Sequence, residues 1–377
     1  MTIDHKRQTK ENLHMKCRVK TTQKQLNEFY HFSHLLNLTD SPDEEAVYEA
    51  VKLMRIKLSE PLQRNQDFHQ NKTTRIKYEA AWGLVNICSE GHEETRLTVE
   101  NNGIACFLSL LLFPNHKYIE IAVWGIGNII DGSEEYRDMV VQQNYVEIIW
   151  RTLQKNLNDD CNRRIAWTMV NICRNWKNQL GQTVLELIMT IFMHMFTNCN
   201  DIEVHKHITV SIFLLIEQNP LIIDVLIVFD FVATLKKLLL HSETELQTCI
   251  MKIFGVISSS HECHVQKVIE CGIFEILPVL ISSSCSQLRR EVLIFLSGIS
   301  AGKDQLKALI FQYNLLPGII YHLHLKNEYV NQREAIWILC DILKSNNVSA
   351  TNSLVNHGII AEFGGLLSSE DYHVRIN

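Results

Sequence analysis

The sequence predicts an all-α fold, a right-handed α-solenoid of about seven stacked repeats with a short basic N-terminal arm. Three observations predict it: a phrase that recurs about every 42 residues, apolar residues at helical spacing, and few helix breakers. Only 6 Pro and 15 Gly occur in 377 residues, which favours long helices over a sheet. Hydrophobic residues make up 46% of the chain, enough for a sizeable core.

Composition limits the compartment. No apolar run reaches the roughly 18–20 residues that a membrane-spanning helix needs. The N-terminus carries charge but lacks the apolar stretch of a secretory signal peptide. The 11 cysteines are scattered and contain no Cys-x-x-Cys pair, which suits a reducing compartment. We therefore expect a protein of the cytoplasm and nucleus.

Charge is distributed unevenly along the chain. Residues 1–28 hold seven Lys or Arg against three acidic residues, a net charge of +4, whereas the whole chain carries −6. The remainder therefore carries about −10, which indicates a cationic partner for the body or an acidic partner for the arm. A solvated tail explains the arm's charge equally well. We assign residues 1–40 to the arm and 41–377 to the solenoid.

The repeat is visible first in a turn residue followed by an apolar helix, as in NNGIACFLSLLL, ECGIFEILPVLI and NHGIIAEFGGLL. Gly, Asn and Asp tolerate the left-handed backbone that separates two helices. Successive turn positions are 41, 86, 42, 42 and 44 residues apart, and 86 is two periods with one copy blurred. The predicted turn residues are Gly103, Asn144, Asp230, Gly272, Asn314 and Gly358.

A second phrase, in register with the first, carries a tryptophan followed four residues later by an asparagine. It reads YEAAWGLVNIC, EIAVWGIGNII and RRIAWTMVNIC. Each unit is thus two short helices and a third helix that bears the tryptophan. Such a unit cannot bury its apolar face alone, so the units must stack. The period alone admits armadillo or HEAT repeats, and the three-helix unit with a Gly or Asn turn favours armadillo.

The tryptophans and asparagines suit an extended peptide. Residues at i and i+4 project from one helix face, so stacked third helices align the pairs as two rows. Slots between parallel indoles accept the stems of Lys or Arg, and asparagine amides match a peptide backbone. A lone tryptophan would more often be a core residue, but asparagine is seldom placed inside a helix for stability. The predicted peptide-binding pairs are Trp82/Asn86, Trp124/Asn128 and Trp167/Asn171.

The segment from about 78 to 175, with AAWGLVNICSEGHEETRL, AVWGIGNIIDGSEEYRDMVV and IAWTMVNICRN, resembles the second to fourth armadillo repeats of importin-α, the nuclear-import adaptor. The resemblance is weaker but in register to about 370. It implies that the concave groove binds lysine-rich nuclear localisation signals of cargo proteins. It also implies that the three intact pairs form the major cargo groove, and that importin-β binds through residues 1–28.

The major groove departs from the importin-α pattern in the residues that would hold a cargo lysine. Thr95 keeps a hydroxyl, and Asp131 or Glu134 supplies the carboxylate in place of the usual aspartate. Arg164 takes a usual asparagine position, three residues before Trp167. A cation there should repel lysine unless Asp159, Asp160 or Asp201 pairs with it.

The pairs do not continue through the chain. Alignment by period places Ile208/Ile212, Lys252/Val256 and Ile294/Gly298 at the next three positions. Trp337 then returns, with Asp341 in place of asparagine. The minor groove of the family is therefore predicted to be weak or absent.

No other constellation predicts an activity. His205/His207 and His261/His264 lack a second ligand pair, so we expect no metal or other cofactor. No phosphate loop, nucleophile motif or catalytic carboxylate pair occurs, so an enzyme is not predicted. The acidic body argues against nucleic acid. The sequence therefore predicts a nuclear import adaptor, with an armadillo scaffold that holds one fixed protein partner, uncoupled from importin-β, as the alternative.

Overall fold

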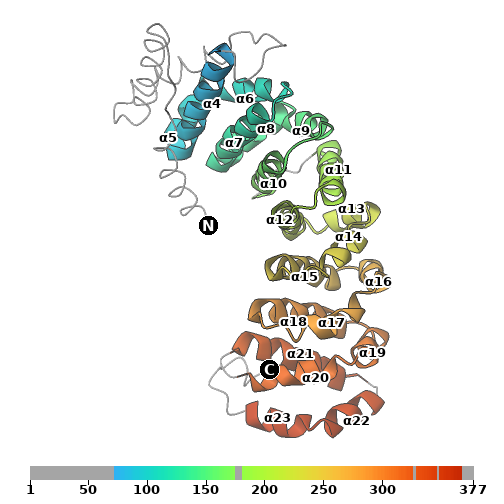
Figure 1. The fold of residues 1–377 in the computed structure, drawn as a ribbon. Coiled ribbons are helices and arrows are strands. Elements are labelled where there is room, and N and C mark those ends of the chain that lie inside the picture. The colour runs from blue at the N-terminus through green and yellow to red at the C-terminus, as the bar shows by residue number, and fades with distance from the viewer. Residues whose placement is uncertain (1–71, 175–180, 326–327, 346–347, 367–377) are drawn as a thin grey trace. The chain divides into compact units, whose positions relative to one another are not determined.

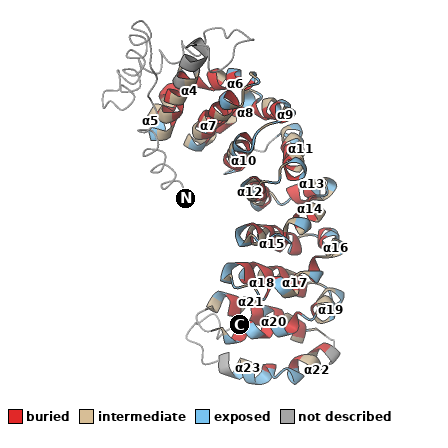
Figure 2. Cartoon of the chain, viewed as in Figure 1, coloured by how far each residue is buried: buried red, intermediate tan, exposed pale blue. Residues whose placement is uncertain are grey.

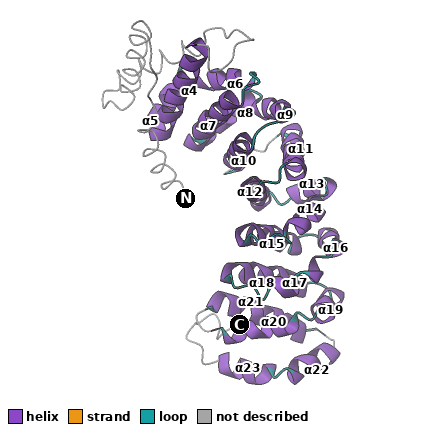
Figure 3. Ribbon diagram, in the orientation of Figure 1, coloured by secondary structure: helices purple, strands orange, loops and turns teal. Residues whose placement is uncertain are grey.

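The computed structural model describes residues 72–174, 181–325, 328–345 and 348–366, and every regular element in these ranges is a helix (Figures 1 and 3). The predicted all-α class is therefore confirmed. The basic arm, residues 1–40, and the degenerate first repeat up to residue 71 lie outside the described residues. No helix in the described ranges is long and apolar enough to cross a lipid bilayer.

The chain divides into two compact units, residues 1–106 and 107–377. In the first unit, the described elements are α4, α5 and the start of α6. All later helices belong to the second unit. The predicted boundary between an arm and a solenoid at residue 40 stays a prediction.

The helices follow the predicted three-helix order. The first helices of the repeats are α5 (His92–Glu100), α8 (Glu134–Gln142), α13 (Ile222–Val228), α16 (Glu262–Glu270), α19 (Asp304–Gln312) and α22 (Val348–Asn356). The second helices are α6 (Gly103–Leu111), α9 (Tyr145–Leu153), α14 (Phe231–Leu238), η1 (Ile273–Glu275) with α17 (Leu277–Leu280), α20 (Leu316–Tyr321) with η2 (His322–His324), and α23 (Ile359–Leu366). The third helices are α4 (Lys72–Glu90), α7 (His116–Gly132), α10 (Asp159–Cys173), α12 (Ile202–Gln218), α15 (Thr244–Ser258), α18 (Ser286–Ser300) and α21 (Tyr329–Leu343).

One repeat differs from the others. Between α10 and α12 the described residues form a single helix, α11 (Gln182–Asn198). Its sequence, VLELIMTIFMHMF, offers no Gly, Asn or Asp at which a left-handed turn would divide it. This explains why one copy of the first phrase is blurred in the sequence.

The predicted turn residues are almost all confirmed by backbone angles. Asn144, Asp230, Asn314, Gly272 and Gly358 have positive φ, between 52° and 79°. The prediction was wrong for Gly103, because Asn102 adopts the left-handed conformation (φ 63°) and Gly103 already begins α6. A Cβ at residue 103 would lie 2.4 Å from Thr98 Cγ2, so glycine serves close packing here and not the turn.

In the second unit the third helices pack in series, α7 on α10, then α12, α15, α18 and α21 (Figure 1). Their inward faces are apolar, and Figure 2 shows the burial continuing from repeat to repeat. Phe254 and Phe295 are 0% exposed and Phe274 is 1% exposed. Burying each such side chain contributes on the order of 2–3 kcal/mol. The predicted solenoid of armadillo-type repeats is confirmed in this way, while the number of repeats is not.

Candidate peptide-binding site on the third helices

The first of the three predicted pairs lies in the first unit. Trp82 and Asn86 stand one turn apart on α4, and both side chains are half-buried. The indole of Trp82 lies 6.2 Å from the Tyr78 ring, centroid to centroid. Thr95 is only 1% exposed, and its hydroxyl lies within hydrogen-bond distance of the carbonyls of Gly91 (2.8 Å) and Cys88 (3.2 Å). The Thr95 hydroxyl, predicted to meet a cargo lysine, is thus turned toward the junction of α4 and α5.

The other two pairs lie in the second unit, on α7 and α10, which pack against each other. Trp124 and Trp167 are both half-buried, so one part of each indole is covered and another part reaches solvent. A Cβ on Gly127 would lie 2.1 Å from Cζ3 of Trp167. The indole of Trp167 therefore rests on the bare backbone of α7, which only glycine permits at this point.

The two asparagines of these helices differ. Asn128 is half-buried, whereas Asn171 is 5% exposed. The Asn171 side-chain amide donates to the main-chain carbonyl of Gly127 at 3.2 Å. One of its donors is thus used to join α10 to α7. In the second unit, Asn128 is the more accessible of the two predicted backbone-reading amides.

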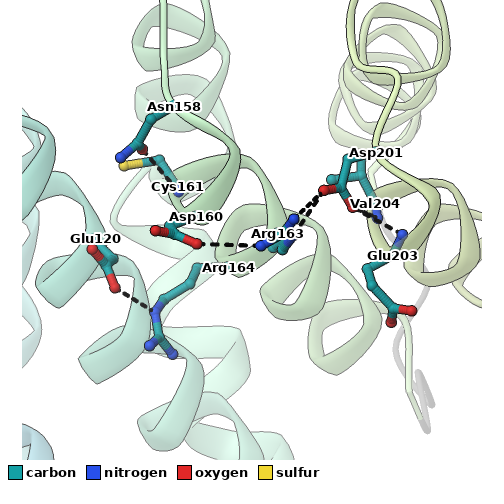
Figure 4. A network of polar contacts seen from close by, with 9 residues as sticks. All are labelled: Glu120, Asn158, Asp160, Cys161, Arg163, Arg164, Asp201, Glu203 and Val204. Atoms are coloured by element: carbon teal, nitrogen blue, oxygen red, sulfur yellow. Dashed lines mark hydrogen bonds and ion pairs between the residues drawn. The ribbon is translucent and has the colours of Figure 1, made fainter.

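Arg164 covers the face of Trp124. Its guanidinium carbon lies 3.9 Å from the indole centroid, a cation–π distance. Its Nε donates to Glu120 Oε1 at 3.2 Å (Figure 4). The prediction that Asp159, Asp160 or Asp201 pairs with Arg164 was wrong, because the ion-pair partner of Arg164 is Glu120 on α7. The neighbouring Arg163 pairs with two of them, Asp160 at 3.3 Å and Asp201 at 2.6 Å.

The two predicted carboxylates lie at the C-terminal end of α7 and the start of α8. Asp131 pairs with Arg174 at 3.0 Å, and both side chains are partly exposed. Glu134 follows Ser133, the N-cap of α8, and lines a surface pocket with Glu135 and Asp138. An incoming lysine would compete with Arg174 for Asp131.

Beyond α10 the positions equivalent to the Trp–Asn pairs carry other residues. Alignment of the N-caps Asn158 and Asp201 places Val210 and Leu214 of α12 where Trp167 and Asn171 stand in α10. The predicted positions Ile208 and Ile212 were wrong, since both are 0% exposed and face the core.

The later positions follow the predicted register. Lys252/Val256 and Ile294/Gly298 are each half-buried. Trp337 is 50% exposed, and Asp341 pairs with Lys344 at 3.5 Å. Trp337 and Asp341 therefore keep solvent access, but α18 offers no aromatic neighbour at the equivalent position.

Sequence reasoning missed several charged residues near these positions. Glu120 and Arg174 each neutralise a residue that the sequence analysis had singled out. Glu291 and Glu334 occupy on α18 and α21 the position that Arg164 has on α10, and burial raises the pKa of both carboxyls. Both glutamates could have been found from the sequence, because each lies three residues before a position equivalent to Trp167.

Histidines of the two clusters singled out in the sequence form contacts within the chain. The His205 ring lies 2.8 Å from the Cys199 carbonyl, and His264 Nε2 lies 2.7 Å from Asp224. Among the described residues, no group of three or more His, Cys, Asp or Glu is placed to hold a metal ion.

Curated relatives of the chain are importin subunits. It is 25% identical over 313 residues to importin subunit alpha-1b of Oryza sativa subsp. japonica, covering 83% of this chain and 49% of that protein. It is 32% identical over 150 residues to importin subunit alpha-2 of Arabidopsis thaliana, covering 40% and 26%. The matched region thus covers about half of the Oryza sativa protein and about a quarter of the Arabidopsis thaliana protein. No protein-family model matches it.

Solved structures agree on the fold. The crystal structure of an engineered protein superposes with a TM-score of 0.73 at 21% identity, covering 90% of this chain and 80% of the other. This structural likeness shows the fold alone. The sequence similarity to importin alpha subunits, together with the three-helix repeats, confirms the resemblance drawn from the Trp–Asn phrases: the chain is a divergent, armadillo-repeat relative of the importin-α subunits.

Proposed function

We propose that the chain binds an extended segment of a partner protein along its third helices. One observation carries the proposal: Trp124 and Trp167 stand at equivalent positions of two packed helices, each with part of its indole open to solvent. Half-covered aromatic side chains that recur in register are typical of a surface that binds a partner. This is a binding function and not an enzymatic one.

The similarity to importin subunit alpha supports two forms of that function, a nuclear import adaptor or an armadillo scaffold for peptides. We favour the adaptor. Its cargo would be proteins with lysine-rich nuclear localisation signals, and it would work in the cytoplasm and nucleus. The acidic body, about −10 without residues 1–28, favours a basic segment by long-range attraction.

The proposed major groove in the second unit comprises Trp124/Asn128, Trp167/Asn171, Asp131 and Glu134. In the first unit we propose Trp82 and Asn86 as peptide contacts, whereas Thr95 is too buried to meet a lysine side chain. Trp124, Asn128 and Trp167 contribute the contacts with solvent access in the second unit. Trp337 and Asp341 form at most a weak second site, because a binding slot needs two neighbouring aromatic faces.

Fluorescence anisotropy of a labelled lysine-rich peptide tests the groove. Replacing Trp124 and Asn128 together by alanine should weaken binding at least about tenfold, equivalent to roughly 1.4 kcal/mol. Trp150→Ala is the matched control, because Trp150 lies on α9, the second helix of its repeat. There its ring meets the His194 ring edge-on, with 5.5 Å between the ring centroids. Unchanged affinity in the double variant would show that the groove is elsewhere.

Importin-β separates the adaptor from the scaffold. A pull-down should capture the full chain with importin-β at micromolar concentration, and deletion of residues 1–40 should abolish capture. A full chain that fails to bind importin-β while still binding the lysine-rich peptide would leave only the scaffold.

A further inference from the structure

We propose that Arg164 sets the specificity of the groove at Trp124, where it excludes lysine and favours an acidic side chain of the bound peptide. The proposal rests on the proposed function, since it concerns the same groove. It means that the preferred ligand is not uniformly basic but carries an Asp or Glu at the point that crosses α7 and α10.

Lysine is excluded because Arg164 already occupies the space that a lysine stem would need. A lysine stem held by the tryptophans must lie against an indole face, and Arg164 already lies on the face of Trp124 at 3.9 Å. Arg164 comes from the helix turn before Trp167, so it enters from the same face of α10 that carries the predicted pair. A lysine would have to displace the guanidinium and break its bond to Glu120, while its own charge faces Arg164 at short range.

The acidic preference follows from the nitrogens that Arg164 does not use. Only its Nε contacts Glu120, at 3.2 Å, and its two terminal nitrogens point away from that carboxylate (Figure 4). Within the described part of the chain these nitrogens have no hydrogen-bond acceptor. A planar guanidinium offers such a pair of N–H groups to one carboxylate, a bidentate arrangement that lysine cannot provide. The side chains of Arg164 and Glu120 are 31% and 33% exposed, so a peptide can reach them.

Apart from Glu120, the nearby carboxylates Asp160, Asp201 and Asp131 pair with other arginines. Asp160 and Asp201 pair with Arg163 at 3.3 and 2.6 Å (Figure 4). Asp131 pairs with Arg174 at 3.0 Å. Glu120 is therefore the one carboxylate that pairs with Arg164 among the described residues, and it leaves half of the guanidinium edge open.

A scan of charge along the peptide tests the proposal. The probes are a labelled lysine-rich peptide and its series of single Lys→Glu variants, titrated by anisotropy into the full chain. At one position glutamate should raise affinity about fivefold to tenfold over lysine, as expected for a charge-assisted bidentate pair in a partly exposed site. Arg164→Gln, which keeps most of the stem and removes the charge, should abolish or invert that preference.

Arg151→Ala is the control for the loss of one cation, because Arg151 lies on α9 and pairs with Glu147. It should leave the glutamate preference unchanged. Thermal unfolding of Arg164→Gln and Arg164→Ala checks that each variant is folded, and either folded variant suffices for the comparison.

The outcomes separate the two proposals. A wild-type chain that binds the lysine-rich peptide through Trp124 and Asn128 but favours glutamate nowhere overturns the role of Arg164 and leaves the groove standing. A glutamate preference that persists in Arg164→Gln likewise overturns it. If neither the parent peptide nor any variant binds the wild type, the proposed function fails, and this inference fails with it.

Discussion

The side-chain amide of Asn171 on α10 donates a hydrogen bond to the main-chain carbonyl of Gly127 on α7, with 3.2 Å between nitrogen and oxygen. The same Gly127 lies under the indole of Trp167. The aromatic and amide members of one predicted peptide-binding pair thus both contact a single backbone position of the preceding repeat. This junction has a structural role in addition to any role in binding.

Asn171→Ala should destabilise the fold. The substitution removes a buried interhelical hydrogen bond, so we expect the free energy of unfolding to fall by about 1–2 kcal/mol. Asn86→Ala is the matched control, because Asn86 holds the same place in its repeat, is half-buried and has no side-chain hydrogen bond among the described residues. Urea denaturation followed by circular dichroism compares the two. Equal losses would contradict a structural role for the Asn171 amide.

Gly127→Ala should be more damaging than its small size suggests. The new methyl would lie 2.1 Å from Cζ3 of Trp167, so the indole or α10 must move, at a cost of about 1–3 kcal/mol. Gly364→Ala is the control, since Gly364 is also helical and a Cβ there meets no atom within 4 Å. It should raise stability slightly, because alanine favours helix over glycine by up to about 1 kcal/mol. A stabilising Gly127→Ala would show that α7 and α10 are packed less closely.

The fold could be predicted from the sequence because each repeat carries the same pattern of apolar residues and turn residues. Apolar residues at helical spacing and turn residues such as Asn144 and Gly272 mark the same helix boundaries in successive copies. The misplacement at Gly103 arose because three residues in a row, Asn101, Asn102 and Gly103, all tolerate a left-handed turn. Only packing against Thr98 reserves the glycine for the helix.

The site was less predictable because its contacts cross between repeats. The spacing of Trp167 and Asn171 predicts that they share a helix face, but the burial of Asn171 depends on Gly127, 44 residues earlier. The Glu120–Arg164 pair spans the same separation. In α12 the register was wrong by two residues, since Val210 follows Trp167 by a full period of 43 and the chosen Ile208 does not.

Cysteine reactivity should follow burial. Burial raises the pKa of the thiols of Cys88 and Cys161 to about 12, so only about one molecule in 10⁴ is a thiolate at pH 8. Cys263 is exposed. N-ethylmaleimide at pH 8 should therefore label Cys263 before any other described cysteine, as peptide mapping by mass spectrometry would show. In guanidinium chloride the three should react alike, and rapid native labelling of Cys88 would mean that the first unit opens readily.

His322 should make stability depend on pH. The ring is 0% exposed, its Nε2 lies 3.3 Å from the Ile281 carbonyl, and burial lowers the pKa of the imidazole. Below the unfolded pKa of about 6.5, the unfolded chain takes up a proton that the folded chain refuses, so stability falls as pH falls. The raised pKa of the carboxyls of Glu291 and Glu334 acts in the opposite direction, which makes a comparison of variants necessary.

His322→Gln keeps an amide donor for the Ile281 carbonyl and removes the titration. Between pH 7 and pH 5.5 its free energy of unfolding should fall less steeply than that of the wild type, by at most about 1.4 kcal/mol per pH unit, the limit for one proton. Denaturant titrations at four pH values measure the slopes, and parallel profiles for wild type and His322→Gln would mean that His322 accepts a proton in the folded chain.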